Sequence, residues 1–289
     1  MIRSMTGFAR RERQGPWGTL TCELRSVNHR YLELSLRLPE DLRGLEGDAR
    51  ALLSGGLRRG KVDAGVYLRG GTAAAPAVEI NRPLLEQLLA GAAVVRRLAG
   101  EAAGPVDALD VLRWPGVIRD TERDVAPVAT AAMELLAETV TGLNEARSRE
   151  GARIREMLVL RCEALRESVA TLRARLPEVA ARIRARVAER VAQLGTTVDA
   201  ERLEQEITLL AYKMDVEEEL DRLGSHITET LQVLDSSEPA GRRLDFLMQE
   251  FNREANTLSS KSQDTETTRA AVDMKVLIEQ MREQVQNVE

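Results

Sequence analysis

Aromatic side chains are scarce in this sequence, since Phe, Trp and Tyr together make up only 3% of its 289 residues. Such a low aromatic content is untypical of β-sandwiches and barrels. Combined with a charged content of 30%, it favours long charged helices. The scarcity also leaves few platforms on which unpaired bases could stack. We therefore expect a mainly helical protein whose contacts with any single-stranded nucleic acid are mostly to the backbone.

Cysteine and long apolar runs are nearly absent as well. The two cysteines, Cys22 and Cys162, have no metal-finger spacing and are too few for a disulfide framework, which indicates a reducing compartment. The start of the chain, MIRSMTGFARRER, places charges where a signal peptide needs an apolar run. No stretch approaches the roughly 20 apolar residues that span a bilayer. We expect a cytoplasmic protein without a membrane partner.

An excess of basic residues is also missing, because the formal net charge is -5. This argues against a chain that coats nucleic acid indiscriminately, because such binding needs concentrated Lys and Arg. Local basic patches remain compatible with the composition.

The first seventy residues contain most of the strand signals. Apolar and polar residues alternate over 20–26, 32–38 and 62–68, and the turn at 14–18 predicts that residues 2–13 pair with the first of these runs. Residues 40–53 have apolar side chains at helical spacing, which predicts a helix there. The N-terminal region is therefore expected to be a small antiparallel β-sheet domain of order β-β-β-α-β.

The remainder of the chain has helical spacing and three predicted subdivisions. The small, proline-punctuated stretch 70–78 is typical of a linker and ends a sheet domain at 1–72. A connector at 79–125, with a helix at 82–98, is expected to pack on that domain. The tract 126–198 predicts a long helical hairpin or a kinked pair of helices, because Pro177 interrupts it after Leu176. The last subdivision, 199–289, is expected to form a C-terminal helix bundle, so the fold class is α+β.

Two of the predicted C-terminal helices combine a buried stripe with a chemically active face. In the helix 199–234, helical spacing brings Asp215, Glu219, Arg222, His226 and Glu229 to one face. A histidine with carboxylates at this spacing can bind a divalent ion, but it can equally form a salt-bridged surface. No HExxH, Cys-pair or P-loop pattern decides between the two.

The helix 241–262 has the second such face. Its apolar stripe runs from Leu244 to Leu258, and Glu250, Glu254 and Lys261 lie on one flank, either in a cleft or as a solvated surface. In its first turn Arg242 opposes the helix dipole, which indicates either a bound anion or a neighbouring carboxylate.

A basic segment connects two of the predicted strands. Arg25, His29 and Arg30 fall in RSVNHR, and Lys61 enters the last strand. Arginine is well suited to binding phosphate, and histidine to proton transfer near neutral pH. An exposed turn without a function is the alternative.

The sequence resembles the YicC/YloC family of bacterial endoribonucleases over nearly its whole length. The similar segments are SMTGFAR, ELRSVNHRYLE, RGKV, RWPGV, DVEEELDRLGSHI, GRRLDFLMQEFNREANTLSSKS and IEQMREQVQNVE. The resemblance implies a cytoplasmic enzyme of RNA turnover that cleaves RNA internally and forms a ring-like homohexamer, with other RNA-decay proteins as further partners. It also implies a divalent cation, manganese or else magnesium. It assigns no role to individual side chains.

Joining the resemblance with the residue patterns gives a hypothesis for the site. The expected metal ligands are Asp215, Glu219, His226 and Glu250, and the expected catalytic residues are His226, Glu250, Glu254 and Arg222. The expected RNA-binding residues are Arg3, Arg25, His29, Arg30, Lys61, Arg242, Arg253 and Lys261.

Two alternatives stay open at this stage. In a metal-free mechanism, His29 and His226 would act as acid and base on the 2′-hydroxyl and the leaving oxygen, giving cyclic phosphate ends. In the other alternative, the protein is a non-catalytic oligomeric RNA-binding or adaptor protein, which would bind RNA and never cleave it.

Overall fold

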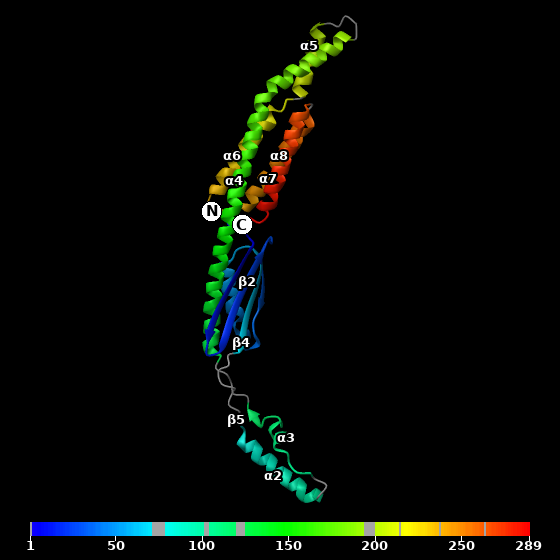
Figure 1. Ribbon diagram of the computed structural model, residues 1–289. Helices are drawn as coiled ribbons and strands as arrows, with labels where there is room; N and C mark the ends of the chain where they lie inside the picture. The colour runs from blue at the N-terminus through cyan, green and yellow to red at the C-terminus, as the bar shows by residue number, and fades with distance from the viewer. Residues whose placement is uncertain are drawn as a thin grey trace.

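The computed structural model describes residues 2–70, 79–100, 104–119, 125–193, 200–213, 215–236, 238–262 and 264–289. Most of the predicted linker 70–78 lies outside these ranges. The described chain is elongated, and Figure 1 shows its parts in succession: the helix α5, a bundle of long helices, a β-sheet, and a small segment containing α2 and α3. The molecule is of the α+β class, as the sequence predicts.

A four-stranded sheet forms the N-terminal domain. Its strands are β1 (Gly7–Gly15), β2 (Gly18–Val27), β3 (Leu32–Arg37) and β4 (Gly60–Gly70), in the order β1-β2-β4-β3. Between β3 and β4 lie the short 3-10 helix η1 (Glu40–Leu45) and α1 (Glu46–Gly56). The predicted order β-β-β-α-β is confirmed, although the first strand begins at Gly7 and not near Ile2.

The pairing of β3 corrects the sequence prediction. We expected only antiparallel strands, but β3 runs parallel to β4 while the other two pairings are antiparallel. The crossover through η1 and α1 is long enough to return the chain in the same direction, which a parallel pair requires. Because β4 has buried apolar residues along its length, it lies between β2 and β3 and separates two strands that are neighbours in sequence.

The helix α4 (Ala126–Gln193) links the sheet to the rest of the molecule. At a rise of 1.5 Å per residue, its 68 residues span about 100 Å. Its buried residues from Val128 to Leu143 belong to the core under the sheet, and those from Ile154 to Leu172 belong to the core of the C-terminal helices. One helix therefore takes part in both hydrophobic cores.

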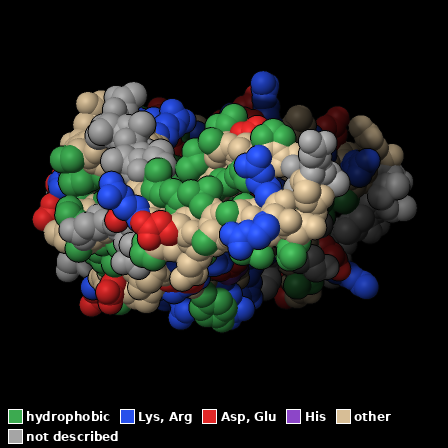
Figure 2. All heavy atoms as spheres, turned by 90° about the horizontal axis from the view of Figure 1, so that it is seen from below, with side chains coloured by type: hydrophobic (Ala, Val, Ile, Leu, Met, Phe, Trp, Pro, Cys, Tyr) green, Lys and Arg blue, Asp and Glu red, His purple; other side chains and the backbone are tan. Residues whose placement is uncertain are grey.

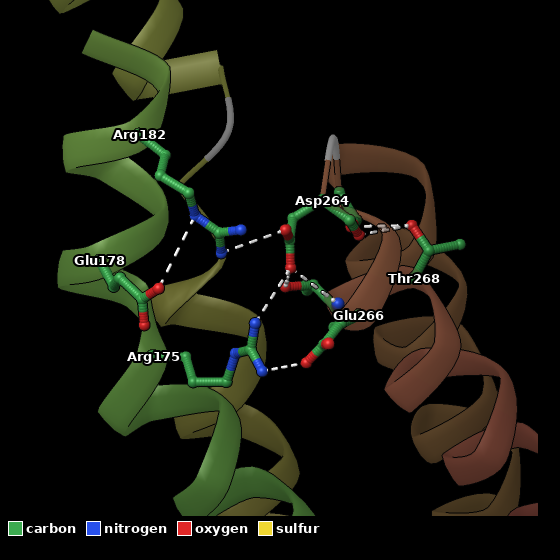
Figure 3. A network of polar contacts seen from close by, with 8 residues as sticks. Arg175, Glu178, Arg182, Asp264, Glu266 and Thr268 are labelled. Atoms are coloured by element: carbon green, nitrogen blue, oxygen red, sulfur yellow. Dashed lines mark hydrogen bonds and ion pairs between the residues drawn. The ribbon is translucent and has the colours of Figure 1, made fainter. Parts of the chain in front are cut away.

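The predicted interruption at Pro177 is wrong, because α4 continues through this residue. A proline removes one backbone hydrogen bond but need not end a helix whose flanking turns are held by other contacts. Arg175 and Arg182, on either side of Pro177, lie 3.8 and 3.3 Å from the carboxylate of Asp264 (Figure 3). The second arm of the hairpin is a separate helix, α5 (Ala200–Lys213), and residues 194–199 between the two lie outside the described ranges.

Three further helices complete the C-terminal bundle. They are α6 (Glu217–Asp235), α7 (Gly241–Lys261) and α8 (Thr265–Val285), and all three are in contact along α4 or along one another. The expected helix 199–234 is instead divided into α5 and α6, so Asp215 lies before α6 and not on its face. The apolar stripe of α7 is buried as predicted, and Asp264 caps α8 by accepting a hydrogen bond from the N–H of Thr267.

A small segment extends beyond the far end of the sheet in Figure 1. It consists of β5 (Glu79–Ile80), α2 (Arg82–Ala99), α3 (Ala108–Leu112) and β6 (Ile118–Arg119). The sequence predicts that it packs on the sheet, whereas no residue of the two described helices is buried. From that end, Figure 2 shows hydrophobic side chains gathered on the surface. The exposed apolar residues here include Leu89, Val94, Val95, Leu98, Leu109 and Trp114.

Cys22 and Cys162 are buried free thiols in separate cores. Among the described helices, none combines the length and the apolar character needed to cross a membrane.

Candidate functional site

The packing of α6 against α7 brings three potential metal ligands together. His226 on α6 and Glu250 and Glu254 on α7 each offer one ligand atom, and these atoms lie within 4.8 Å of one another. Glu250 and Glu254 share a face because they are four residues apart on one helix. We call these three residues the His226 cluster.

The environment of the imidazole fits a bound cation. Nε2 of His226 is buried and has no hydrogen-bond partner among the described residues, which is costly for a polar atom. The ring packs edge-to-face on Phe251, with centroids 5.8 Å apart, and Phe251 is fully buried. A cation would satisfy the orphaned nitrogen, and one imidazole with two carboxylates is a donor set that manganese and similar divalent ions accept.

Arg222 links the His226 cluster to the surface. It lies one turn before His226, and its Nη1 donates a hydrogen bond of 3.3 Å to Oε1 of Glu254, which is itself only 3% exposed. Its Nη2 donates to Glu218 at 2.5 Å. The hydrogen bond with Glu254, followed by the charge of Glu218, raises the pKa of Arg222 above its usual value. The guanidinium thus holds one carboxylate of the cluster in place.

Glu219 and Asp215, the other two predicted ligands, lie outside the cluster. Nζ of Lys261 lies 2.9 Å from Oε1 of Glu219 and donates to the backbone oxygen of Asp215 at 3.0 Å. The carboxylate of Asp215 accepts a hydrogen bond from the N–H of Glu217, at the start of α6. Glu219 is therefore already paired with a cation, the carboxylate of Asp215 caps the start of α6, and their role as metal ligands stays a prediction.

The predicted RNA-binding residues fall into separate groups. Arg253 is exposed near the His226 cluster, 3.9 Å from Oε2 of Glu250. In the sheet domain, Nε2 of His29 lies 3.6 Å and Nζ of Lys61 lies 3.2 Å from the carboxylate of Glu33. Arg30 stacks over the ring of Tyr31. The described contacts of His29 and those of His226 thus belong to different domains.

Arg3 and Arg242 contribute to a third location, together with Arg58 and Arg59. These four arginines line a cavity of about 920 Å³ where the two ends of the chain meet α4 and the start of α7. We call it the arginine cavity. Sequence reasoning did not find it, because its walls come from segments far apart in the chain, and no local spacing connects them.

The sequence matches two models of one protein family, which together cover nearly the whole chain. Residues 2–156 match the family model "Endoribonuclease YicC-like, N-terminal region", and residues 172–289 match "Endoribonuclease YicC-like, C-terminal". The chain belongs to the YicC-like endoribonuclease family.

Relatives cover the chain from end to end. It is 40% identical over 289 residues to a Haemophilus influenzae protein named "Probable endoribonuclease YicC", with the whole of both chains covered. It is 29% identical over 298 residues to a Clostridioides difficile protein of the same name, again over the whole of both chains. The resemblance identified from the sequence motifs is therefore confirmed.

Proposed function

We propose that this protein is an endoribonuclease that cleaves RNA internally with the help of a divalent cation held by His226, Glu250 and Glu254. Two observations carry the proposal: among the described residues the buried Nε2 of His226 has no hydrogen-bond partner, and a ring nitrogen of His226 lies within 4.8 Å of carboxylate oxygens of Glu250 and Glu254. Membership in a family whose named relatives are probable endoribonucleases supports the choice of RNA as substrate.

The roles of the chain's own residues follow from their contacts. A bound divalent cation would activate water and neutralise charge on the scissile phosphate. Arg222 orients Glu254 through its hydrogen bond and brings a positive charge to the edge of the cluster. Arg253 is exposed next to Glu250 and is available to a phosphate of the RNA. Manganese is the proposed ion, with magnesium as the alternative.

The remaining parts of the proposal rest on the family resemblance and on charge. Arg25, Arg30 and Lys61 of the sheet domain would guide the RNA backbone, together with His29. The protein would act in the cytoplasm as a homohexamer in RNA turnover, with other RNA-decay proteins as partners.

The metal-free mechanism receives less support. His29 and His226 would have to act on one phosphodiester, but their described contacts lie in different domains. Metal-assisted hydrolysis breaks the P–O3′ bond by attack of water and leaves a 3′-hydroxyl and a 5′-phosphate, whereas the histidine pair would leave a cyclic phosphate. The chemistry of the product ends therefore separates the two mechanisms.

One set of reactions tests the proposal. End-labelled RNA is incubated with the protein in manganese or in chelator, and the product ends are identified. We expect cleavage in manganese only, with 3′-hydroxyl ends, and at least about a 100-fold loss of rate in His226→Ala and in Glu250→Gln. Calorimetric titration of the same variants with manganese should show weakened binding.

Glu279→Gln is the matched control, because Glu279 is an exposed glutamate of α8 that pairs only with Arg282 among the described residues. It should cleave and bind manganese like the unaltered protein. Full activity of both folded cluster variants would refute the metal site. Binding of RNA without cleavage in any divalent ion would instead select the adaptor alternative.

A further inference from the structure

The arginine cavity lies apart from the His226 cluster. Its lining includes Arg3 near the start of the chain, Arg58 and Arg59 between α1 and β4, Arg242 in the first turn of α7, and Glu289. Arg242 precedes Glu250 by eight residues on α7, which is about 12 Å along a helix axis. A ligand in the cavity would therefore not occupy the proposed metal site.

The cavity holds positive charge that the protein does not neutralise. Among the described residues, Arg3, Arg58 and Arg242 form no ion pair, and the Nε of Arg59 donates only to the backbone oxygen of Arg30, at 3.2 Å. Two other charged residues of the lining have ion-pair partners: Arg155 pairs with Asp235, and Glu289 pairs with Arg147. Four arginines therefore lie with two glutamates that have no ion-pair partner among the described residues, Glu156 and Glu238, which leaves an excess of two positive side-chain charges.

The start of α7 adds to this positive field. No described side chain caps its N-terminus, so the first N–H groups of a 21-residue helix carry their partial positive charge at the cavity wall. Arg242 and Arg243 in the first turn both oppose the helix dipole. Glu229 compensates Arg243 through an ion pair, but no described carboxylate compensates Arg242. An anion in the cavity would resolve this conflict.

The walls of the cavity are fixed by close backbone packing. A Cβ atom on Gly241 would lie 2.4 Å from the backbone oxygen of Val288, and one on Gly151 would lie 2.3 Å from that of Ile2. The two ends of the chain are also hydrogen-bonded to each other, from the N–H of Glu289 to the oxygen of Arg3 at 2.9 Å. The backbones that position the arginines are thus held before any ligand binds, which lowers the entropic cost of binding.

We propose that the arginine cavity binds a 5′-phosphate monoester carried by a nucleotide unit, either the 5′ end of an RNA or a free mononucleotide. A phosphate monoester carries close to two negative charges at neutral pH, which matches the excess charge of the cavity, whereas an internal phosphodiester carries one. Arginine donates to phosphate oxygens in a bidentate manner. The volume of about 920 Å³ falls within the range of small-molecule sites, so a whole nucleotide fits beside its phosphate.

This inference rests on the proposed function where the ligand is RNA. The hydrolysis proposed above leaves a 5′-phosphate on the downstream product. A pocket for that group would make the protein prefer RNA that has already been cut once. A free mononucleotide in the same pocket would compete with such an end.

The test is a set of binding measurements in chelator, where cleavage is suppressed. Fluorescence anisotropy compares one short RNA with a 5′-phosphate or a 5′-hydroxyl, labelled at its 3′ end. Unlabelled 5′-mononucleotide and orthophosphate serve as competitors. We expect at least about tenfold tighter binding of the 5′-phosphorylated RNA, or direct binding of the 5′-mononucleotide over its nucleoside if the free nucleotide is the ligand.

Three variants test whether the preference for the 5′-phosphate arises in the arginine cavity. Arg58→Gln and Arg242→Gln should each remove most of the preference for the 5′-phosphate, and Arg58→Gln should leave the affinity for 5′-hydroxyl RNA nearly unchanged. Arg43→Gln is the matched control, since Arg43 is an exposed arginine of η1 that pairs with Glu40 and does not line the cavity. It should retain the full preference.

The outcomes separate this inference from the proposed function. Equal affinity for 5′-phosphorylated and 5′-hydroxyl RNA, together with no binding of the mononucleotide, would overturn the inference even if cleavage in manganese is intact. A preference that survives both cavity substitutions would also overturn it. A preference retained in a chain that never cleaves RNA would support the pocket and refute the nuclease proposal instead.

Discussion

Nη2 of Arg147 lies 2.9 Å from Oε2 of Glu289, although 142 positions separate the two residues in the sequence. Arg147 is 1% exposed, and its Nε also donates a hydrogen bond of 2.6 Å to the backbone oxygen of Ser4. Burial lowers the pKa of Arg147, and the charge of Glu289 opposes that change while the charge of Arg3 adds to it. A single side chain of α4 thus binds both ends of the chain.

Replacing Arg147 by Ala should be strongly destabilising. The substitution leaves the Glu289 carboxylate and two backbone oxygens without their donor, and breaking a buried ion pair from one side costs about 3–5 kcal/mol. Urea denaturation measures the change in the free energy of unfolding. Arg149→Ala, at an exposed position two residues away, is the control and should change stability by no more than about 0.5 kcal/mol. Equal effects of the two substitutions would contradict the anchoring role of Arg147.

Two helix glycines should not tolerate alanine. A Cβ on Gly151 or on Gly241 would lie 2.3 or 2.4 Å from a backbone oxygen, so the chain ends would have to move. We expect each Gly→Ala substitution to cost about 1–3 kcal/mol by overpacking. Gly224→Ala in α6 is the matched comparison, because nothing lies within 4 Å of its added Cβ. That variant should gain up to about 1 kcal/mol from helix propensity. Thermal unfolding of the three variants measures both the expected loss of stability at Gly151 and Gly241 and the expected gain at Gly224.

Asp264 should contribute stability that depends on pH. Partial burial alone would raise the pKa of Asp264, but the two hydrogen bonds from Thr267 and the charges of Arg182 and Arg175 together lower it. Figure 3 shows both arginines of α4 next to Asp264. A lowered pKa in the folded state gives stability that is present above the unfolded pKa of about 3.9 and is lost as pH falls through the folded value. Asp264→Asn keeps a capping oxygen and removes only the charge.

Urea denaturation between pH 7 and pH 3 checks this dependence. We expect Asp264→Asn to be less stable than the unaltered protein by about 1 kcal/mol at pH 7, with a difference that shrinks below about pH 4. Glu266→Gln removes an exposed partner of Arg175 from the same network and should cost no more than about 0.5 kcal/mol at any pH. A difference for Asp264→Asn that stays constant with pH would show that the charge is not the cause.

The pair of Lys261 and Glu219 should be structural. Glu219 has a side chain only 7% exposed, and within the described part of the chain its Oε2 lacks a hydrogen-bond partner. Lys261→Met would leave this carboxylate buried without its cation, at a cost of about 3 kcal/mol. Adding Glu219→Gln in the same chain should recover part of that loss. The two single variants and the double variant, measured by urea denaturation, form the cycle that isolates the pair.

Manganese titration of Glu219→Gln decides the remaining question at this position. Because Lys261 already holds Glu219, we expect the affinity of the protein for manganese to be unchanged by this substitution. A clear loss of affinity would restore Glu219 to the set of metal ligands predicted from the sequence.

Local pattern was sufficient for most of the secondary structure. The apolar stripe of α7 from Leu244 to Leu258 is buried along its whole length, and Asp264 caps α8 as its position predicts. Such features depend on residues within one or two turns of each other. The direction of β3 and the continuity of α4 through Pro177 depend instead on partners elsewhere in the chain, namely β4 and Asp264.

The same division holds for the candidate sites. The sequence by itself determined the family, the buried stripe of α7 and the residue types that can bind a metal or a phosphate, because these are properties of side chains and their periodicity. Only the tertiary structure decided that His226 meets Glu250 and Glu254 while Glu219 pairs with Lys261, and that Arg3, Arg58 and Arg242 surround one cavity. The physical reason is that these contacts join separate segments, and helix packing and the pairing of the two chain ends set their distances.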